Sequence, residues 1–121
     1  MEVSGLTRRP IFSPSVGHFA QGMLVSIPLF LDDLPEKPEA EELEAALAAH
    51  YAEAAYVHVL RPDDETRLEP ESLNGSNDLE LRVFANPAQR EAVLVAKLDN
   101  LGKGASGAAI QNLQLMLGPS E

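Results

Sequence analysis

The sequence predicts a single α+β domain, with a mostly antiparallel or mixed sheet and helices on one face. Four short apolar or alternating segments indicate strands, and two stretches with apolar residues every three or four positions indicate helices. A length of 121 residues suits one domain with its own core and is too short for two. The predicted order is strand, helix, strand, strand, strand, helix.

The first half of the chain is predicted to hold a linker, a strand and a helix. Residues 1–10 are polar and end at a proline, which is typical of an incoming linker. Residues 23–31 are rich in strand-forming residues, and Pro28 favours an edge position because it has no N–H group to donate. Pro38 suits the first position of a helix of about four turns. The apolar stripe of this helix comprises Leu43, Leu47, Tyr51 and Ala54.

The second half is predicted to hold three strands and a final helix. Residues 56–60 and 78–84 alternate apolar and polar side chains, and a polar loop at 61–76 separates them. The apolar run 92–98 indicates a buried strand, which should form an antiparallel hairpin with 78–84. A sheet face left open in the monomer would need a second copy to cover it. The apolar positions of the final helix are Ile110, Leu113 and Leu117.

Residues 102–107 spell the G-x-G-x-x-G pattern of dinucleotide-binding folds, between a predicted strand and a predicted helix. That fingerprint also requires a second strand with an acidic residue about 20 positions further on. The sequence ends at Glu121 without such a strand, so we interpret the glycines as a tight strand-to-helix turn. The free N–H groups at the start of such a helix, beside polar residues at a strand end, suit a ligand.

Charge and cysteine content exclude several classes of function. Nineteen acidic against nine basic side chains give a net charge of −10, which disfavours nucleic acid as a partner. The acidic clusters at 32–44 and 63–71 are interpreted as solvated surfaces. The absence of cysteine excludes disulfides, thiolate zinc sites and cysteine nucleophiles in this sequence. No membrane-spanning run or signal peptide is found, so a soluble, cytoplasmic chain without a membrane partner is expected.

The polar candidates do not form a catalytic or metal centre of their own. No residue supplies a nucleophile beside an oriented base, so no catalytic residue is predicted. The three histidines have no further ligands at suitable spacing, so no metal site is predicted, and His58 is expected to pack within its strand. Asn77 enters a strand after a turn that needs no functional explanation, and the functional alternative is that its amide points toward a site. The pair Asp99-Asn100 is better placed, between a strand and a helix start. Lys103 is either an anion contact there or simply solvated.

Three blocks of the sequence resemble one enzyme family. LDNLGKGASGAAIQNLQLMLG, residues 98–118, resembles the C-terminal signature of N-acetyl-gamma-glutamyl-phosphate reductases. FSPSVGHFAQGM, residues 12–23, is similar to the short-form (type 2) branch, and GSNDLELRV, residues 75–83, matches the start of a late strand in that family. Aspartate-semialdehyde dehydrogenases share the Asp-Asn and Lys-Gly-Ala elements of the first block, but the other two blocks favour the reductase.

The resemblance implies part of an NADPH-dependent enzyme of arginine biosynthesis, which reduces an acyl phosphate to N-acetylglutamate semialdehyde through a cysteine thioester. It implies a fold like the C-terminal domain of glyceraldehyde-3-phosphate dehydrogenase, which provides the interface of a homodimer or tetramer. The family's nucleophilic cysteine, its His-x-Pro-Glu element and its N-terminal Rossmann domain are absent from this sequence. We therefore expect the chain alone to be inactive and to bind NADP weakly. The alternative is a stand-alone interaction module.

The resemblance also implies roles for four residues. Asn100 matches the asparagine expected near the nicotinamide, where a side-chain amide could orient the carboxamide. Gln21 stands where long-form relatives carry arginine before glycine, which suggests a neutral contact to substrate. Asn77 and Lys103 match family positions that line or support the site. His18 does not match the family's catalytic histidine element and inherits no role.

Overall fold

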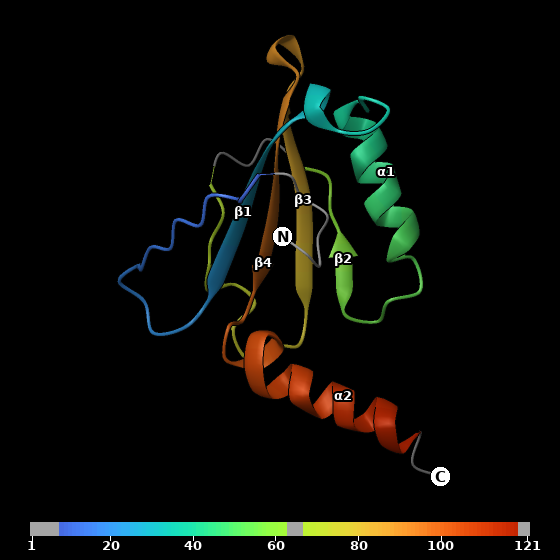
Figure 1. Cartoon of the computed structure of the whole chain (residues 1–121). Coiled ribbons are helices and arrows are strands. Elements are labelled where there is room, and N and C mark those ends of the chain that lie inside the picture. The colour runs from blue at the N-terminus through green and yellow to red at the C-terminus, as the bar shows by residue number, and fades with distance from the viewer. Residues whose placement is uncertain (1–7, 63–66, 119–121) are drawn as a thin grey trace.

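The computed structural model of the protein describes residues 8–62 and 67–118, so most of the predicted linker 1–10 lies outside the described residues. The predicted order of strands and helices is confirmed (Figure 1). The elements are β1 (Met23–Phe30), α1 (Ala40–His50), β2 (Val57–Val59), β3 (Leu79–Asn86), β4 (Glu91–Leu98) and α2 (Gly107–Leu117). Short turns add η1 (Leu31–Asp33), η2 (Pro87–Gln89) and the π-helical η3 (Gly102–Ser106).

The four strands form one mixed sheet in the order β1-β4-β3-β2. β4 lies between β1 and β3 and is antiparallel to both, whereas the short β2 pairs in parallel with β3. The predicted hairpin is confirmed, with Leu79 opposite Leu98 and Asn86 opposite Glu91. The edge position predicted from Pro28 is also confirmed, because β1 is an edge strand of the sheet. The mixed sheet with two helices confirms the α+β class.

The core lies between α1 and the sheet face that carries Val83 and Ala92. These two side chains are 4% and 3% exposed, and they cluster with Leu31 and Ala40. Leu43 and Leu47 of α1 pack against this cluster, as the predicted stripe required. α1 contacts β2 and β3, so it covers the β3 side of this face and leaves β1 open.

The opposite sheet face carries a cluster of buried charges. Glu80 and Lys97 are opposite each other on β3 and β4, and Lys97 Nζ lies 2.8 Å from Glu80 Oε2. Arg82 Nη1 lies 2.7 Å from the same oxygen. Burial opposes ionisation of Glu80, but the hydrogen bonds from Lys97 and Arg82 outweigh it and lower the pKa of this carboxyl. The charges of this cluster are therefore paired although the side chains are largely shielded from water.

α1 begins later and is shorter than predicted. Its N-cap is Glu39, so Pro38 lies before the helix and not at its first position. Glu39 and Glu42 form a reciprocal capping box, in which the Glu39 N–H donates to Glu42 Oε2 at 2.7 Å. The helix ends at His50 after 11 residues, so Ala54 lies beyond it. The predicted four turns are thus reduced to about three.

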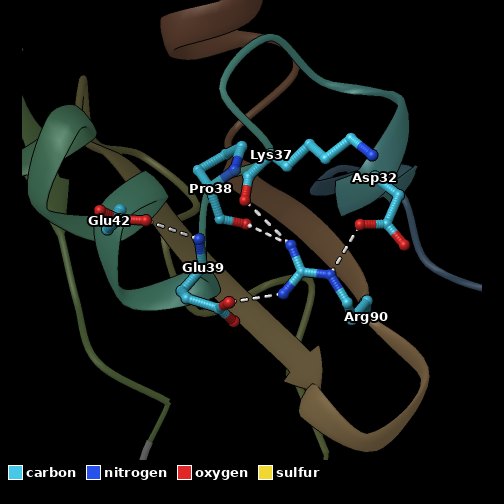
Figure 2. A network of polar contacts seen from close by, with 6 residues as sticks. All are labelled: Asp32, Lys37, Pro38, Glu39, Glu42 and Arg90. Atoms are coloured by element: carbon cyan, nitrogen blue, oxygen red, sulfur yellow. Dashed lines mark hydrogen bonds and ion pairs between the residues drawn. The ribbon is translucent and has the colours of Figure 1, made fainter.

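Arg90 fastens the β3–β4 hairpin to the chain that leads into α1 (Figure 2). Its guanidinium donates to Asp32 Oδ1 at 2.8 Å, to the Glu39 carboxylate and to the Lys37 carbonyl oxygen at 2.9 Å. The hydrogen bond from Arg90 lowers the pKa of Asp32. Two members of the acidic cluster 32–44, predicted to serve only as a solvated surface, therefore anchor the hairpin.

α2 projects from one end of the sheet instead of lying on its face (Figure 1). Its main contacts are with η3, the turn that precedes it. The predicted apolar stripe is on a helix, but Ile110, Leu113 and Leu117 are 57%, 53% and 76% exposed. α1 is therefore the helix that covers a sheet face, and the stripe of α2 is left open by the described residues.

Candidate functional site

The four predicted site residues lie near the sheet end at which β4 finishes and β1 and β3 begin. β1 and β3 are both antiparallel to β4, so their starts meet its end. This geometry accounts for segments from distant parts of the sequence lying together. Gln21, Asn77, Asn100 and Lys103 come just before β1, just before β3, just after β4 and from η3, respectively.

Asp99 forms the polar centre of this sheet end and is only 1% exposed. Its Oδ2 accepts hydrogen bonds from the Gly75 N–H at 2.8 Å and from Gln21 Nε2 at 3.0 Å. Its Oδ1 accepts a bond from the Leu101 N–H at 2.9 Å. The backbone bonds from Gly75 and Leu101 lower the pKa of Asp99, so the carboxylate is ionised at neutral pH. The sequence pattern indicated the Asp99-Asn100 pair by its place but predicted no role for Asp99.

Asn100 is oriented by the backbone of the segment that enters β1. The Gly22 N–H donates to Asn100 Oδ1 at 2.7 Å. A backbone N–H needs an acceptor, so the oxygen of the amide faces Gly22 and the NH₂ group faces elsewhere. Among the described residues, Asn100 Nδ2 has no hydrogen-bond partner. The NH₂ group of Asn100 is therefore an unused hydrogen-bond donor in the described part of the chain.

Gly22 allows this contact because of its backbone conformation. Its φ of 111° is one that residues with a side chain rarely adopt. A Cβ at this position would also overlap the carbonyl oxygen of Pro70 and lie 3.2 Å from Asn74 Oδ1. Glycine therefore lets the chain before β1 pass close to the loop before β3.

Gln21 and Asn77, predicted to face substrate, are both held within the protein. The Gln21 side-chain amide nitrogen donates to Asp99 Oδ2, and the backbone carbonyl oxygen of Gln21 accepts from Asn74 Nδ2 at 3.2 Å. The Asn77 side chain lies against Gly107 at the start of α2, where a Cβ would overlap its Oδ1. Gln21 is therefore joined to the group around Asp99, and Asn77 packs against the helix start.

Lys103 is directed along α2. Its Nζ donates to Gln111 Oε1 at 2.9 Å and lies 5.8 Å from the centre of the Tyr56 ring. The structure thus joins Gln21 and Asn100 through Asp99 and Gly22, while the Lys103 ammonium has separate partners.

The glycine run 102–107 forms a tight turn, as predicted. The Gly104 N–H donates to the Asp99 carbonyl oxygen at 2.9 Å, and the Ser106 N–H donates to the Leu101 carbonyl oxygen at 3.2 Å. These bonds span five residues and give the turn its π-helical form. β4, the strand that precedes this run, is antiparallel to both of its neighbours, β1 and β3, whereas a dinucleotide-binding βαβ unit has parallel strands. The glycines therefore do not follow a strand of such a unit in the described sheet.

Neither a metal centre nor a membrane span is found in the part that the structure describes. Residues 8–62 and 67–118 contain no group of three or more His, Cys, Asp or Glu able to hold a metal ion. Neither helix of that part has the length and apolar character needed to cross a bilayer.

His58 was predicted to pack within its strand, but its side chain is 46% exposed, with Nε2 3.2 Å from Asp78 Oδ1. That prediction was wrong.

An open apolar groove runs beside α2. It has a volume of about 930 Å³ and lies between α2 and the turn at residues 54–56. Ile110, Leu113 and Leu117 line it from the helix, and Tyr56 lines it from the turn. The exposed stripe of α2 therefore forms one wall of a hollow surface.

Comparison with known proteins places the chain in a family. A family profile described as "Semialdehyde dehydrogenase, dimerisation domain" matches residues 1–100. The N-acetyl-gamma-glutamyl-phosphate reductase 2 of Pseudomonas putida is 51% identical over 118 residues, which cover 95% of this chain and 38% of that protein. The reductase of Burkholderia cenocepacia is 51% identical over 120 residues, covering 97% of this chain and 38% of its own length. That of Rhizobium etli is 53% identical over 121 residues, covering 97% and 39%.

These matches confirm the resemblance read from the three sequence blocks. The chain spans less than two fifths of the length of these relatives. The profile covers most of the chain, including every strand of the sheet. The chain belongs to the semialdehyde dehydrogenase dimerisation-domain family.

Proposed function

We propose that the chain is the C-terminal dimerisation domain of a cytoplasmic, NADPH-dependent N-acetyl-gamma-glutamyl-phosphate reductase of arginine biosynthesis. Identity of 51–53% over 95–97% of the chain with three such reductases carries the proposal. These relatives also favour the reductase over an aspartate-semialdehyde dehydrogenase. The parent enzyme reduces an acyl phosphate to a semialdehyde, and this domain supplies a subunit interface and part of the active-site wall.

The open side of the sheet supports the interface role. Met23, Val25 and Ile27 are 40%, 41% and 50% exposed on the β1 portion of the face that α1 leaves uncovered. Contiguous exposed apolar surface of this kind marks protein–protein contact sites. A second copy of the domain would bury it, in a homodimer or in a tetramer built from such dimers.

The groove beside α2 supports a second contact, to the remainder of the parent enzyme. Ile110 and Leu113 are more than half exposed and line an apolar hollow. The relatives are more than twice as long as this chain, so a large part of each lies outside the match. The N-terminal Rossmann domain of the parent would cover the groove and bring the cofactor to the sheet end.

The free amide nitrogen of Asn100 at the sheet end supports a contact with one edge of a nicotinamide. Asn100 Nδ2 is free of partners among the described residues, and a carboxamide oxygen is an acceptor of matching polarity. Gln21 and Asn77 would form the substrate-side wall, and Lys103 would support it from η3. When bound, NADPH supplies the hydride; the nucleophile and the acid–base group come from the remainder of the parent, so no catalytic residue is assigned to this chain.

The proposal is tested by comparing the full-length gene product with the 121-residue chain. The full-length protein should oxidise NADPH in the presence of N-acetyl-gamma-glutamyl phosphate, whereas the chain alone should not turn over and should bind NADPH weakly. Turnover by the chain alone would contradict the proposal that the catalytic groups lie in the remainder of the parent enzyme. A full-length protein that accepts aspartyl phosphate instead would assign it to the semialdehyde dehydrogenases.

The interface is tested separately by light scattering on the full-length protein. Ile27→Lys places a charge on the open part of the sheet face and should convert dimers to monomers. Ala49→Lys, on an exposed position of α1, is the matched control and should leave the dimer intact. A wild-type protein that is monomeric at all concentrations would refute the interface role.

A further inference from the structure

Asp99 connects three segments that are far apart in the sequence. Its carboxylate holds Gln21 from the chain before β1, Gly75 from the loop before β3 and Leu101 from the turn after β4. Gln21 and Asp99 are separated by 78 positions. A carboxylate that accepts several N–H bonds away from water forms short, strong contacts. Its surroundings therefore fix the relative position of three chain segments at one point.

These contacts bracket Asn100 on both sides. The Leu101 N–H, on the peptide that follows Asn100, is bound to Asp99 Oδ1. The Gln21 side chain is bound to Asp99 Oδ2, and the next residue, Gly22, provides the N–H that holds Asn100 Oδ1. Asp99 thus controls the backbone of Asn100 directly and its amide group through the segment at Gln21.

We propose that Asp99 is the positioning residue of this site, whose carboxylate fixes Asn100 so that its free amide nitrogen faces the bound ligand. The inference rests on the proposed function, because it takes the ligand of Asn100 to be the nicotinamide of NADPH. Asp99 itself is nearly inaccessible to solvent, so it acts through Asn100 and not by touching the cofactor.

The substitution Asp99→Asn tests this assignment at nearly constant side-chain size. An amide offers one acceptor oxygen and an NH₂ group, whereas the site presents donors from Gly75, Leu101 and Gln21. At least one of these donors must lose its partner, which releases either the turn after Asn100 or the segment before β1. The amide of Asn100 then loses its fixed direction.

The experiment measures KM and kcat of the full-length enzyme for NADPH in a double-mutant cycle. Asp99→Asn should raise the KM for NADPH about fivefold, the effect of losing one uncharged hydrogen bond. Asn100→Ala should produce a similar increase, and adding Asp99→Asn to Asn100→Ala should cause no further change in KM. Independent, multiplying effects of the two substitutions would overturn the inference.

Arg90→Gln serves as the matched structural control. Arg90 anchors the other end of the same hairpin, far from the site, through Asp32 and Glu39. This variant should lose stability yet keep the wild-type KM for NADPH, and an equal rise in KM would show that Asp99 acts only through general stability. If Asp99→Asn does not fold, Gln21→Met takes its place, because it removes one donor from the same carboxylate. Gln21→Met is then combined with Asn100→Ala, and multiplying effects of these two substitutions on KM would again overturn the inference.

Failure of the inference differs from failure of the proposed function. An active wild-type reductase whose KM for NADPH is unchanged by Asp99→Asn overturns the positioning role alone. A wild-type protein that binds NADPH without reducing the acyl phosphate overturns the proposed reaction. In that case the double-mutant cycle of Asp99→Asn and Asn100→Ala is completed by measuring the dissociation constant for NADPH in place of KM. A wild-type protein that does not bind NADPH overturns both.

Discussion

Replacing Gly107 by alanine should destabilise the domain, because Asn77 occupies the space that a methyl group would need. A Cβ at position 107 would overlap Asn77 Oδ1 and would lie 2.8 Å from the Gly102 carbonyl oxygen. Gly107 is the first residue of α2, with a φ of −63°, so its backbone conformation is open to any residue. The cost therefore comes from packing and not from the backbone angle.

The magnitude follows from two opposing effects. Overpacking at a close contact costs about 1–3 kcal/mol, whereas alanine in a helix is more favourable than glycine by up to about 1 kcal/mol. Because a Cβ at Gly107 would overlap Asn77 Oδ1 severely, the upper part of the overpacking range applies, about 2–3 kcal/mol. Subtracting about 1 kcal/mol for the helix preference leaves a net loss of about 1–2 kcal/mol, with the larger value expected if Asn77 cannot rotate away. With a denaturant slope of about 2 kcal/mol per molar, this lowers the urea midpoint by about 0.5–1 M.

Urea denaturation followed by circular dichroism measures this change, with Gly104→Ala as the matched control. A Cβ at Gly104 would lie 3.3 Å from Leu98 Cδ1 and 3.5 Å from the Asp99 carbonyl oxygen, so this substitution should leave the midpoint nearly unchanged. The cost of Gly107→Ala should also shrink when Asn77→Ala has first removed the obstructing amide. A Gly107→Ala protein as stable as the Gly104→Ala protein would refute the packing explanation.

Two further predictions concern the charged groups. The pKa of Asp99 is lowered in the folded state, so its contribution to stability is present above the unfolded pKa near about 4 and is lost on acidification. The urea concentration at the unfolding midpoint should therefore decrease as the pH is lowered from about 6 to about 3. This decrease should be smaller in Asp99→Asn. A midpoint with the same acid dependence in both proteins would contradict this. Arg90→Gln should lower the midpoint less than Gly107→Ala does, and the loss should diminish in high salt because the bonds to Asp32 and Glu39 are partly exposed. A loss that is independent of salt would show that packing of the Arg90 side chain matters more than its charge.

The sheet was predictable because its signals are local. The alternating residues of β3, the apolar run of β4 and the Asn-Pro turn between them are visible within about 20 residues of sequence. The start of α1 was missed because the capping box of Glu39 and Glu42 decides where the helix begins, whereas Pro38 suggested an earlier start. The exposure of α2 could not be predicted, because helical spacing shows which residues share a face and not what covers that face.

The position of the candidate site in the fold was predictable in part for the same reason. Asn100 and Lys103 stand at a strand-to-helix turn that the sequence shows directly. The importance of Asp99 depends on donors at Gln21 and Gly75, whose positions are set by the strand order. A single sequence does not show which distant N–H groups will converge on a carboxylate, so this role became clear only from the three-dimensional arrangement.

The bonds that join Gln21 to Asp99 and Gly22 to Asn100 each close a loop of 78 residues. Contacts of such long sequence separation form late in folding, after local units such as the β3–β4 hairpin, because the entropy of closing the loop must be overcome first. The geometry around Asn100 is therefore completed only when both ends of the domain have come together. A folding intermediate that contains only the hairpin would lack this geometry, so the fixed orientation of Asn100 belongs to the finished domain and not to its precursors.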